Sequence, residues 1–397
     1  MRQKRGLYYA ICALAGLVLS SLCLAAPKYK ILHAFGVGSD GAGLWGSLAR
    51  DSAGNLYGTT SGGGAYGYGT VFELTPGADG AWAEKILHSF RKNDPDGDVP
   101  TSGPILDPAG SLYATTPSGG GPDTFGTVFE LSPGPDWKLT VIHRFGRNDK
   151  TAGPYTGVVS HEGKLWGAEG CDFTLTPSSH AWKETILSCL PGGGLAIGGP
   201  VFDSFGNAYG STQHGGKSKR CGGGCGTVYE LSPQGDDKWK ETILHSFQAY
   251  WDGSYPGLGA LTLDASGNVY GTADGGNSGY GVIFRMSLDS NGRWKETVLY
   301  NLAGGAEGDH PGAGVVMDKA GNLYGTTIAG GAYDSGVVYK LAPGKNGKWT
   351  YTVLHTFDYS DGAQPDANMI LDEKGNLYGT TATGGPGGYG VAFELTP

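Results

Sequence analysis

Two kinds of loop residue in this 397-residue chain could bind a ligand: carboxylates and aromatic rings. An acidic-Gly-x-x-Pro pattern recurs, and Asp96, Asp252 and Asp361 supply its acid. A Gly-Gly pair followed by an aromatic residue also recurs. Aromatic rings stack on the apolar faces of sugars, and carboxylates accept hydrogen bonds from sugar hydroxyls. The candidate ligand-binding residues are these three aspartates and Tyr66, Tyr68, Phe125, Tyr280, Tyr333 and Tyr389.

Five histidines occupy one repeated position and could suggest a metal cluster. That position falls on the outermost strand of each predicted unit, three strand spacings of about 4.8 Å from the innermost strand, so the histidines diverge. We therefore expect a repeated packing or hydrogen-bonding role and predict no metal site. Repeated tryptophans are interpreted as packing residues between units. The histidines are His33, His88, His143, His245 and His355; the tryptophans are Trp82, Trp137, Trp182, Trp239, Trp294 and Trp349.

Four cysteines follow the first 26 residues, and an even number suggests two disulfides in an exported protein. Cys171 and Cys189 fall on neighbouring strands of one unit, where a cross-strand disulfide can form. Cys221 and Cys225 would close an enlarged loop. The alternative for that second pair is a metal site with His214 as a third ligand, although zinc sites usually have four ligands.

These residues lie within a tandem repeat of about 55 residues. The phrase Asp-Ser-Ala-Gly-Asn-Leu-Tyr-Gly-Thr-Thr at 51–60 returns five times, with a degraded copy at 160–169. A second phrase, Gly-Thr-Val-Phe-Glu-Leu-Thr-Pro at 69–76, and a third, Trp-Lys-Glu-Thr-Ile-Leu-His-Ser-Phe at 239–247, follow the same spacing. Each unit reads as four short antiparallel strands with tight turns, which predicts an all-β, seven-bladed β-propeller.

The order of the phrases predicts how the ring closes. The chain from residue 29 opens with the fourth-strand phrase Tyr-Lys-Ile-Leu-His-Ala-Phe, and it closes at Phe393-Glu-Leu, a third-strand phrase. We expect the N-terminal strand to complete the last blade, so that no open sheet edge remains between the two ends. Residues 27–397 then form one propeller domain.

The phrases Asn-Leu-Tyr-Gly-Thr-Thr, Gly-Gly and Gly-Thr-Val-Phe-Glu-Leu resemble the GloVer (Gloeo/Verruco) tandem repeat of exported bacterial proteins. The resemblance extends from about residue 28 to the end. It implies an extracytoplasmic protein and carries over no catalytic residue.

Residues 1–26 read as a secretory signal peptide, because Arg2, Lys4 and Arg5 precede an uncharged apolar run that ends in small residues. An uncleaved membrane anchor is the alternative. Cleavage would change the net charge from −9 to −12, which argues against nucleic acid and anionic membranes as partners. We expect a secreted or periplasmic monomer that does not bind a membrane after cleavage.

The segments expected to line the central channel contain neither a histidine nor an acid, which argues against catalysis. They are residues 48–50, 104–106, 157–159, 200–202, 261–263, 315–317 and 369–371. The leading hypothesis is a non-enzymatic propeller that binds a polysaccharide or a protein on its loops. The alternatives are a carbohydrate-active hydrolase or lyase that uses loop carboxylates, and a structural envelope protein without a dedicated ligand. No cofactor is predicted, and calcium in an acidic loop is left open.

Overall fold

The computed structural model describes residues 26–36, 38–146, 153–179, 181–189, 199–235, 238–256 and 259–397, except for the side chain of Glu169. The predicted signal peptide lies outside these residues apart from Ala26. Within the described part of the chain, no helix is long and apolar enough to cross a membrane.

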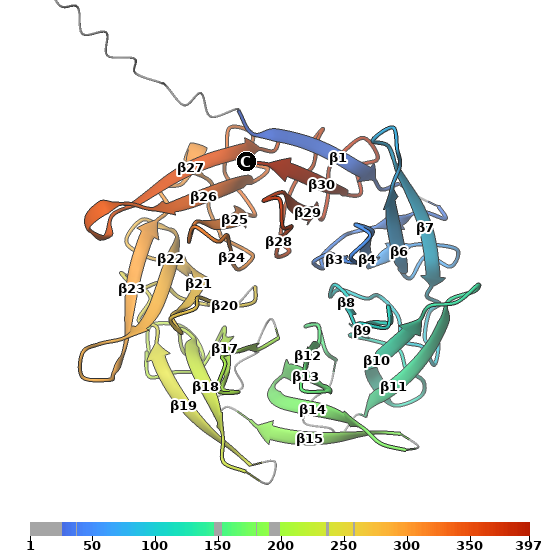
Figure 1. Ribbon diagram of the computed structural model, residues 1–397, viewed down its shortest axis with the longest axis horizontal. Coiled ribbons are helices and arrows are strands. Elements are labelled where there is room, and N and C mark those ends of the chain that lie inside the picture. Colours follow the sequence, from blue (N-terminus) through green and yellow to red (C-terminus); the bar gives the residue numbers. More distant parts are fainter. Residues whose placement is uncertain are drawn as a thin grey trace, which may run out of the picture.

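Seven four-stranded antiparallel sheets stand around a central axis, each with its shortest strand innermost (Figure 1). This arrangement confirms the predicted seven-bladed propeller. Blades 1 to 4 consist of β3 (Ala49–Arg50), β4 (Leu56–Thr60), β6 (Thr70–Pro76) and β7 (Trp82–Ser89); β8 (Ile105–Leu106), β9 (Leu112–Thr116), β10 (Thr124–Ser132) and β11 (Lys138–Gly146); β12 (Val159–His161), β13 (Lys164–Glu169), β14 (Cys171–Pro177) and β15 (Trp182–Ser188); and β16 (Val201–Phe202), β17 (Ala208–Thr212), β18 (Thr227–Pro233) and β19 (Trp239–Ser246). Blades 5 to 7 consist of β20 (Thr262–Leu263), β21 (Val269–Gly275), β22 (Gly279–Leu288) and β23 (Trp294–Asn301); β24 (Val316–Met317), β25 (Leu323–Thr327), β26 (Val337–Pro343) and β27 (Trp349–Thr356); and β28 (Ile370–Leu371), β29 (Leu377–Thr381), β30 (Val391–Thr396) and β1 (Lys28–Ala34). The remaining elements are the strand pair β2 (Gly41–Ala42) and β5 (Gly62–Gly63) and the single 3₁₀ turns η1 (Gly305–Glu307) and η2 (Lys345–Gly347).

The N-terminal strand closes the ring as predicted. β1 pairs antiparallel with β30, and Ile31 lies opposite Phe393 (Figure 1). Nearer the axis, on β29 of this last blade, the Thr380 hydroxyl donates a hydrogen bond to the carbonyl of Gly46, which precedes blade 1. The last blade therefore contacts blade 1 through side chains and backbone.

The hydrophobic core is divided into seven clusters, one at each junction between neighbouring blades. At five junctions a buried phenylalanine at or just after the end of the fourth strand packs against a phenylalanine on the third strand of the next blade. The ring centroids of Phe35 and Phe72 are 4.9 Å apart, and those of Phe247 and Phe284 are 5.3 Å apart. The repeated tryptophans also pack between blades, as expected: the ring of Trp137 lies 6.1 Å from Tyr57.

The first phrase of the repeat folds into a tight turn and a buried strand. In blade 6 the Asp318 carboxylate accepts hydrogen bonds from the backbone N–H groups of Ala320 and Asn322, and Gly321 has a φ of +81°. The glycine of the following strand has a packing reason, although blade 2 has Ala114 at this position. In blade 1 a Cβ at Gly58 would lie 2.4 Å from the ring of Phe72, so a side chain there would displace the core.

Both predicted disulfides are present. Cys171–Cys189 links the third strand of blade 3 to the end of its fourth, and Cys221–Cys225 closes a loop in blade 4. In blade 3 a single residue, Gly170, separates β13 from β14, so this blade lacks the long loop of its neighbours. The second disulfide occupies both sulfurs that the alternative metal site would need as thiolates.

Candidate functional site

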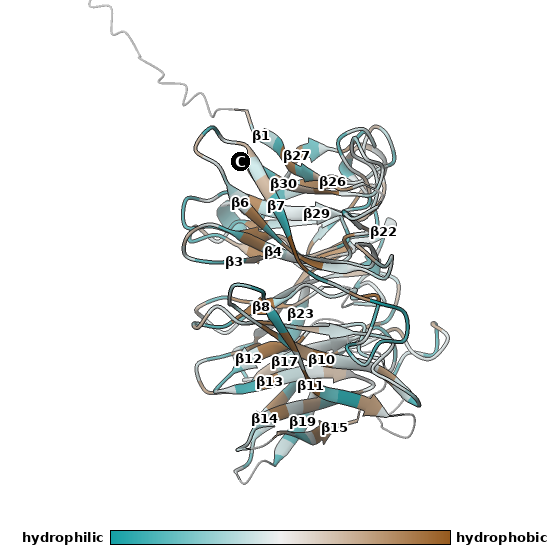
Figure 2. Ribbon diagram, turned by 90° about the vertical axis from the view of Figure 1, so that its right-hand side faces the viewer, coloured by the Kyte–Doolittle hydropathy of each residue, from teal (hydrophilic) through white to brown (hydrophobic). Residues whose placement is uncertain are grey.

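The loops between blades and the loops between second and third strands share one end of the disc, which we call the loop face. Single antiparallel bridges join the two sets. Figure 2 shows the disc from its edge, with the strands running between its two ends. The bridges connect Asp98 with Ser118, Ser254 with Asp274, Asp309 with Ala329 and Ala363 with Thr383.

Five of the six predicted aromatic residues are exposed on the loop face, with exposed fractions between 40% and 65%. Tyr68 is the exception, because it is half-buried against the core between blades 1 and 2. The Arg91 guanidinium lies 4.0 Å from the ring centroid of Tyr66 and so covers one face of that ring. The exposed residues are Tyr66, Phe125, Tyr280, Tyr333 and Tyr389.

The three predicted aspartates face histidines of the fourth strands. A carboxylate oxygen lies 3.6 Å from the imidazole Nε2 in the pair Asp96–His88, 3.1 Å in Asp252–His245 and 2.9 Å in Asp361–His355. Asp252 is only 2% exposed and also accepts a hydrogen bond from the backbone N–H of Gln248. His245 hydrogen-bonds to Asp252, and each of the three imidazoles packs edge-on against the phenylalanine two residues further along the chain, so the histidines have the packing or hydrogen-bonding role expected of them. Ligand binding by the aspartates stays a prediction.

One cavity brings two predicted residues together. Tyr66 and Asp96 line a cavity of about 510 Å³ with His88 and Arg91. Burial lowers the pKa of His88, although the nearby Asp96 opposes the shift, so the imidazole is neutral at pH 7. Burial also raises the pKa of Asp96, with His88 opposing. The cavity therefore offers an aromatic face, a guanidinium and a carboxylate.

A second cavity, of about 270 Å³, lies where the loop face meets the central channel. We call it the channel mouth and define it by Trp45, Thr101, Tyr155, Asp366 and Asn368. The rings of Trp45 and Tyr155 are 42% and 66% exposed. The channel mouth therefore combines two accessible aromatic rings with a carboxylate and two uncharged polar side chains.

Asp366 corrects the expectation that the channel contains no acid. The segments considered in the sequence begin at the innermost strands, but Asp366 precedes its strand and reaches the channel through the loop. Burial raises the pKa of its carboxyl to about 6, and the negative charge of Asp274 adds to the shift. Gly312 leaves room for it, since a Cβ there would lie 2.5 Å from Asp366 Oδ1.

The channel mouth was missed because its residues do not repeat. Thr101, Tyr155 and Asp366 each follow a loop proline, and Gly312 does so in blade 6. At this one position the units differ, because it holds a threonine at 101, a tyrosine at 155 and an acid at 366. The repeated aspartates and aromatic residues favoured the outer loops as the predicted site instead.

The family model of the Gloeobacter/Verrucomicrobia repeat matches residues 14–174 and 196–397. The chain belongs to this family. The resemblance expected from the Asn-Leu-Tyr-Gly-Thr-Thr phrases is therefore confirmed, and the Gloeobacter/Verrucomicrobia repeat folds here into propeller blades. No curated protein matches the chain.

Solved structures resemble this Gloeobacter/Verrucomicrobia repeat protein at low sequence identity. The extracellular domain of a protein described as a one component system of B. thetaiotaomicron has a TM-score of 0.52 and 12% identity, over 92% of this chain and 40% of the other. A Xanthomonas campestris gluconolactonase has a TM-score of 0.41 and 11% identity, over 93% and 89%. A Trypanosoma rangeli sialidase in complex with sialic acid has a TM-score of 0.43 and 11% identity, over 93% and 58%.

Proposed function

We propose that this protein binds a polysaccharide outside the cytoplasm through the loop face, with the channel mouth holding one sugar residue, and that it does not catalyse a reaction. The observation that carries the proposal is the exposure of Trp45 and Tyr155 beside Asp366. An aromatic ring is costly to expose to water, and a ring beside polar groups matches a sugar, which has apolar faces and hydroxyl edges.

The size and polarity of the channel mouth support a small carbohydrate unit. Its volume of about 270 Å³ is at the small end of the range for ligand pockets. Thr101 and Asp366 supply hydroxyl and carboxyl groups for sugar hydroxyls. The exposed rings farther out, such as Tyr280 and Tyr389, would contact neighbouring residues of a longer chain.

An extracytoplasmic location is supported by two observations. The disulfides Cys171–Cys189 and Cys221–Cys225 fit an oxidising compartment. Residues 1–26 have the composition of a signal peptide. Expression of the full chain followed by mass spectrometry of the product tests cleavage near Ala26, and an uncleaved product would favour the membrane anchor.

Asp366 favours a second candidate function, the cleavage of a polysaccharide by a hydrolase or lyase reaction. A carboxyl with a pKa of about 6 can donate a proton near neutral pH. Glycoside hydrolases, however, use a pair of carboxyl groups on either side of the bond. Among the described residues that line the channel mouth, Asp366 is the one acid, so binding is the better supported function.

A glycan-array screen of the exported protein, with and without calcium, tests the proposal. We expect hits that are lost in Trp45→Ala and Tyr155→Ala. Phe205→Ala is the matched control, because Phe205 is 84% exposed and sits in the turn between β16 and β17, away from the loop face. Hits that survive both channel-mouth substitutions would contradict the proposal. Release of reducing ends from a bound polysaccharide, abolished by Asp366→Asn, would favour the enzyme.

A further inference from the structure

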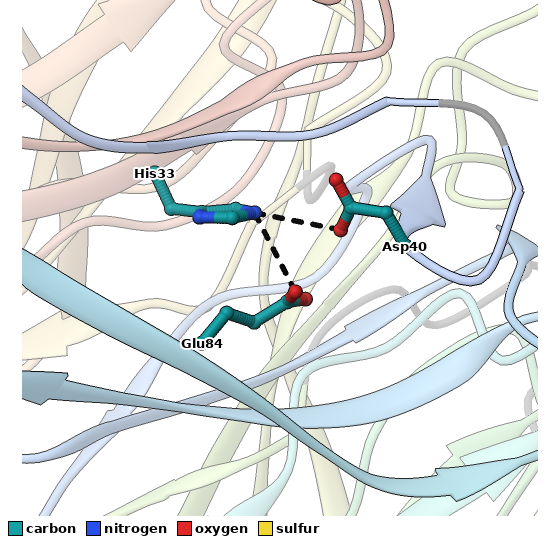
Figure 3. A group of neighbouring side chains, drawn as sticks. All are labelled: His33, Asp40 and Glu84. Carbon is teal, nitrogen blue, oxygen red and sulfur yellow. Dashed lines mark hydrogen bonds and ion pairs between the residues drawn. The ribbon is translucent and has the colours of Figure 1, made fainter.

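A histidine and two carboxylates meet where the last blade joins the first. His33 lies on β1, Asp40 on the loop that follows, and Glu84 on β7 of blade 1. In Figure 3 both carboxylates approach the imidazole on its Nε2 side. The distance from His33 Nε2 is 3.4 Å to Asp40 Oδ1 and 3.7 Å to Glu84 Oε2. All three potential ligand atoms lie within 4.8 Å of one another.

The group has an excess of negative charge. Among the described side chains, His33 is the one ion-pair partner of Asp40 and Glu84. Glu84 Oε1 is buried and has no hydrogen-bond partner within the described residues. Two carboxylates and one imidazole thus converge on one point, where a cation would balance the excess negative charge.

Two other junctions show that a carboxylate at the position of Glu84 is not a requirement of the fold, although Glu184, Glu241 and Glu296 also hold this position. The position of Glu84 is held by Leu139 at the next junction, where His88 faces Asp96 alone. It is held by Tyr29 between blades 6 and 7, where the tyrosine ring stacks on His355 at 3.9 Å. An apolar or aromatic residue thus fills the position without adding charge.

The junction between blades 4 and 5 has the same residue types but not the same geometry. Asp252 hydrogen-bonds to His245 at 3.1 Å, and both its carboxylate oxygens accept from the N–H of Gln248. Glu296, at the position of Glu84, does not come within 4.8 Å of both partners. Among the described residues, the compact group therefore occurs once.

We propose that His33, Asp40 and Glu84 bind one divalent transition-metal ion, which links the ring-closing strand β1 to blade 1. Ligand atoms about 2.0 Å from a tetrahedral ion lie about 3.3 Å apart, close to the two distances measured from His33 Nε2. One imidazole nitrogen and two carboxylate oxygens suit Zn²⁺, and a water molecule would complete the coordination.

The site would act on stability rather than on the sugar-binding loop face. Its ligands come from both sides of the closing junction, so the ion binds only when β1 is in place. A ligand that binds only the folded protein stabilises it in proportion to the logarithm of its concentration. We therefore expect Zn²⁺ to raise the temperature at which the ring opens.

The test measures zinc stoichiometry and thermal unfolding of the tag-free, chelator-treated protein. We expect one Zn²⁺ per chain by elemental analysis, and a Tm rise of about 3 °C when Zn²⁺ is at a hundred times its Kd. Glu84→Leu reproduces the residue type found at Leu139 and should weaken zinc binding at least about 100-fold. Glu296→Leu is the matched control and should keep the full stoichiometry.

Glu84→Gln serves as a second variant, because it keeps the shape of the side chain and removes its charge. It should also lose the zinc-dependent Tm rise. Binding of no Zn²⁺ by the unmodified protein would overturn the proposal, and so would equal zinc binding by Glu84→Leu. Stabilisation by Ca²⁺ without any effect of Zn²⁺ would also overturn it.

Discussion

Truncation of Phe35 tests whether the ring is closed by its N-terminal strand. Phe35 follows β1, is 0% exposed and packs 4.9 Å from Phe72 of blade 1. Its replacement by alanine removes most of a buried aromatic side chain at the 7–1 junction. Substitutions of this kind cost about 3–5 kcal/mol, from lost burial and from the cavity left behind. We expect Phe35→Ala to lower the free energy of unfolding by that amount.

Phe247→Ala provides the comparison at an internal junction. Phe247 is equally buried, packs 5.3 Å from Phe284, and donates its backbone N–H to Gly226 as Phe35 does to Gly390. In a closed ring the two substitutions should have costs within about 1 kcal/mol of each other. Urea unfolding monitored by tryptophan fluorescence measures both. A loss below about 1 kcal/mol for Phe35→Ala, beside a full loss for Phe247→Ala, would show that β1 does not close the ring.

Three further predictions concern single local features. Replacing Cys171 and Cys189 by serine should lower the free energy of unfolding by about 3 kcal/mol, against about 2 kcal/mol for the Cys221–Cys225 pair, because the first disulfide spans 18 residues and the second spans 4. Chemical denaturation of the two double variants measures both losses, and equal losses would contradict the expectation. Asp318→Ala should cost about 2 kcal/mol at pH 7, since four hydrogen bonds from Ala320, Asn322 and Tyr324 are lost. The same measurement on Asp289→Ala should show a smaller loss, because this aspartate lies in an outer turn and accepts two backbone hydrogen bonds there, from Asn291 and Arg293. Burial raises the pKa of Glu296 to about 7, an effect that His245 opposes and Asp252 assists. The unfolded chain therefore loses this proton at a lower pH than the folded protein does, and stability falls as the pH rises from 4.5 to 7. Glu296→Gln should be more stable than the unmodified protein by about 1 kcal/mol at pH 8, after allowance for solvent screening, and equal to it at pH 4.

The fold could be predicted because each repeated phrase encodes one strand or turn. The turn aspartate, the left-handed glycine and the strand glycine have local reasons that hold in nearly every unit, as Asp318, Gly321 and Gly58 show. Ring closure followed from the order of the phrases at the two ends of the chain. The disulfide Cys171–Cys189 followed from strand register, because both residues fall on adjacent strands.

The candidate site was predicted less well, because exposure depends on contacts between loops. Asp252 has the same sequence pattern as Asp96, yet it is buried against His245, whereas Asp96 lines a cavity. The pattern specifies the turn that presents the carboxylate but not the depth at which the turn packs. Asp366 was missed for a related reason. The path of its loop over the central channel follows from the closure of the whole ring.

The positions at which the blades differ therefore say more about ligand binding than those at which they agree. A residue repeated in most blades must satisfy a need that most blades share, as the inter-blade histidines and their aspartates do. A propeller has one axis, so the loops of several blades can contribute residues to a site on that axis. At the residue after the loop proline, the blades supply Thr101, Tyr155 and Asp366, while Gly312 leaves space for the carboxylate. Such unlike groups, converging on one cavity from equivalent backbone positions, are what recognition of an asymmetric ligand requires.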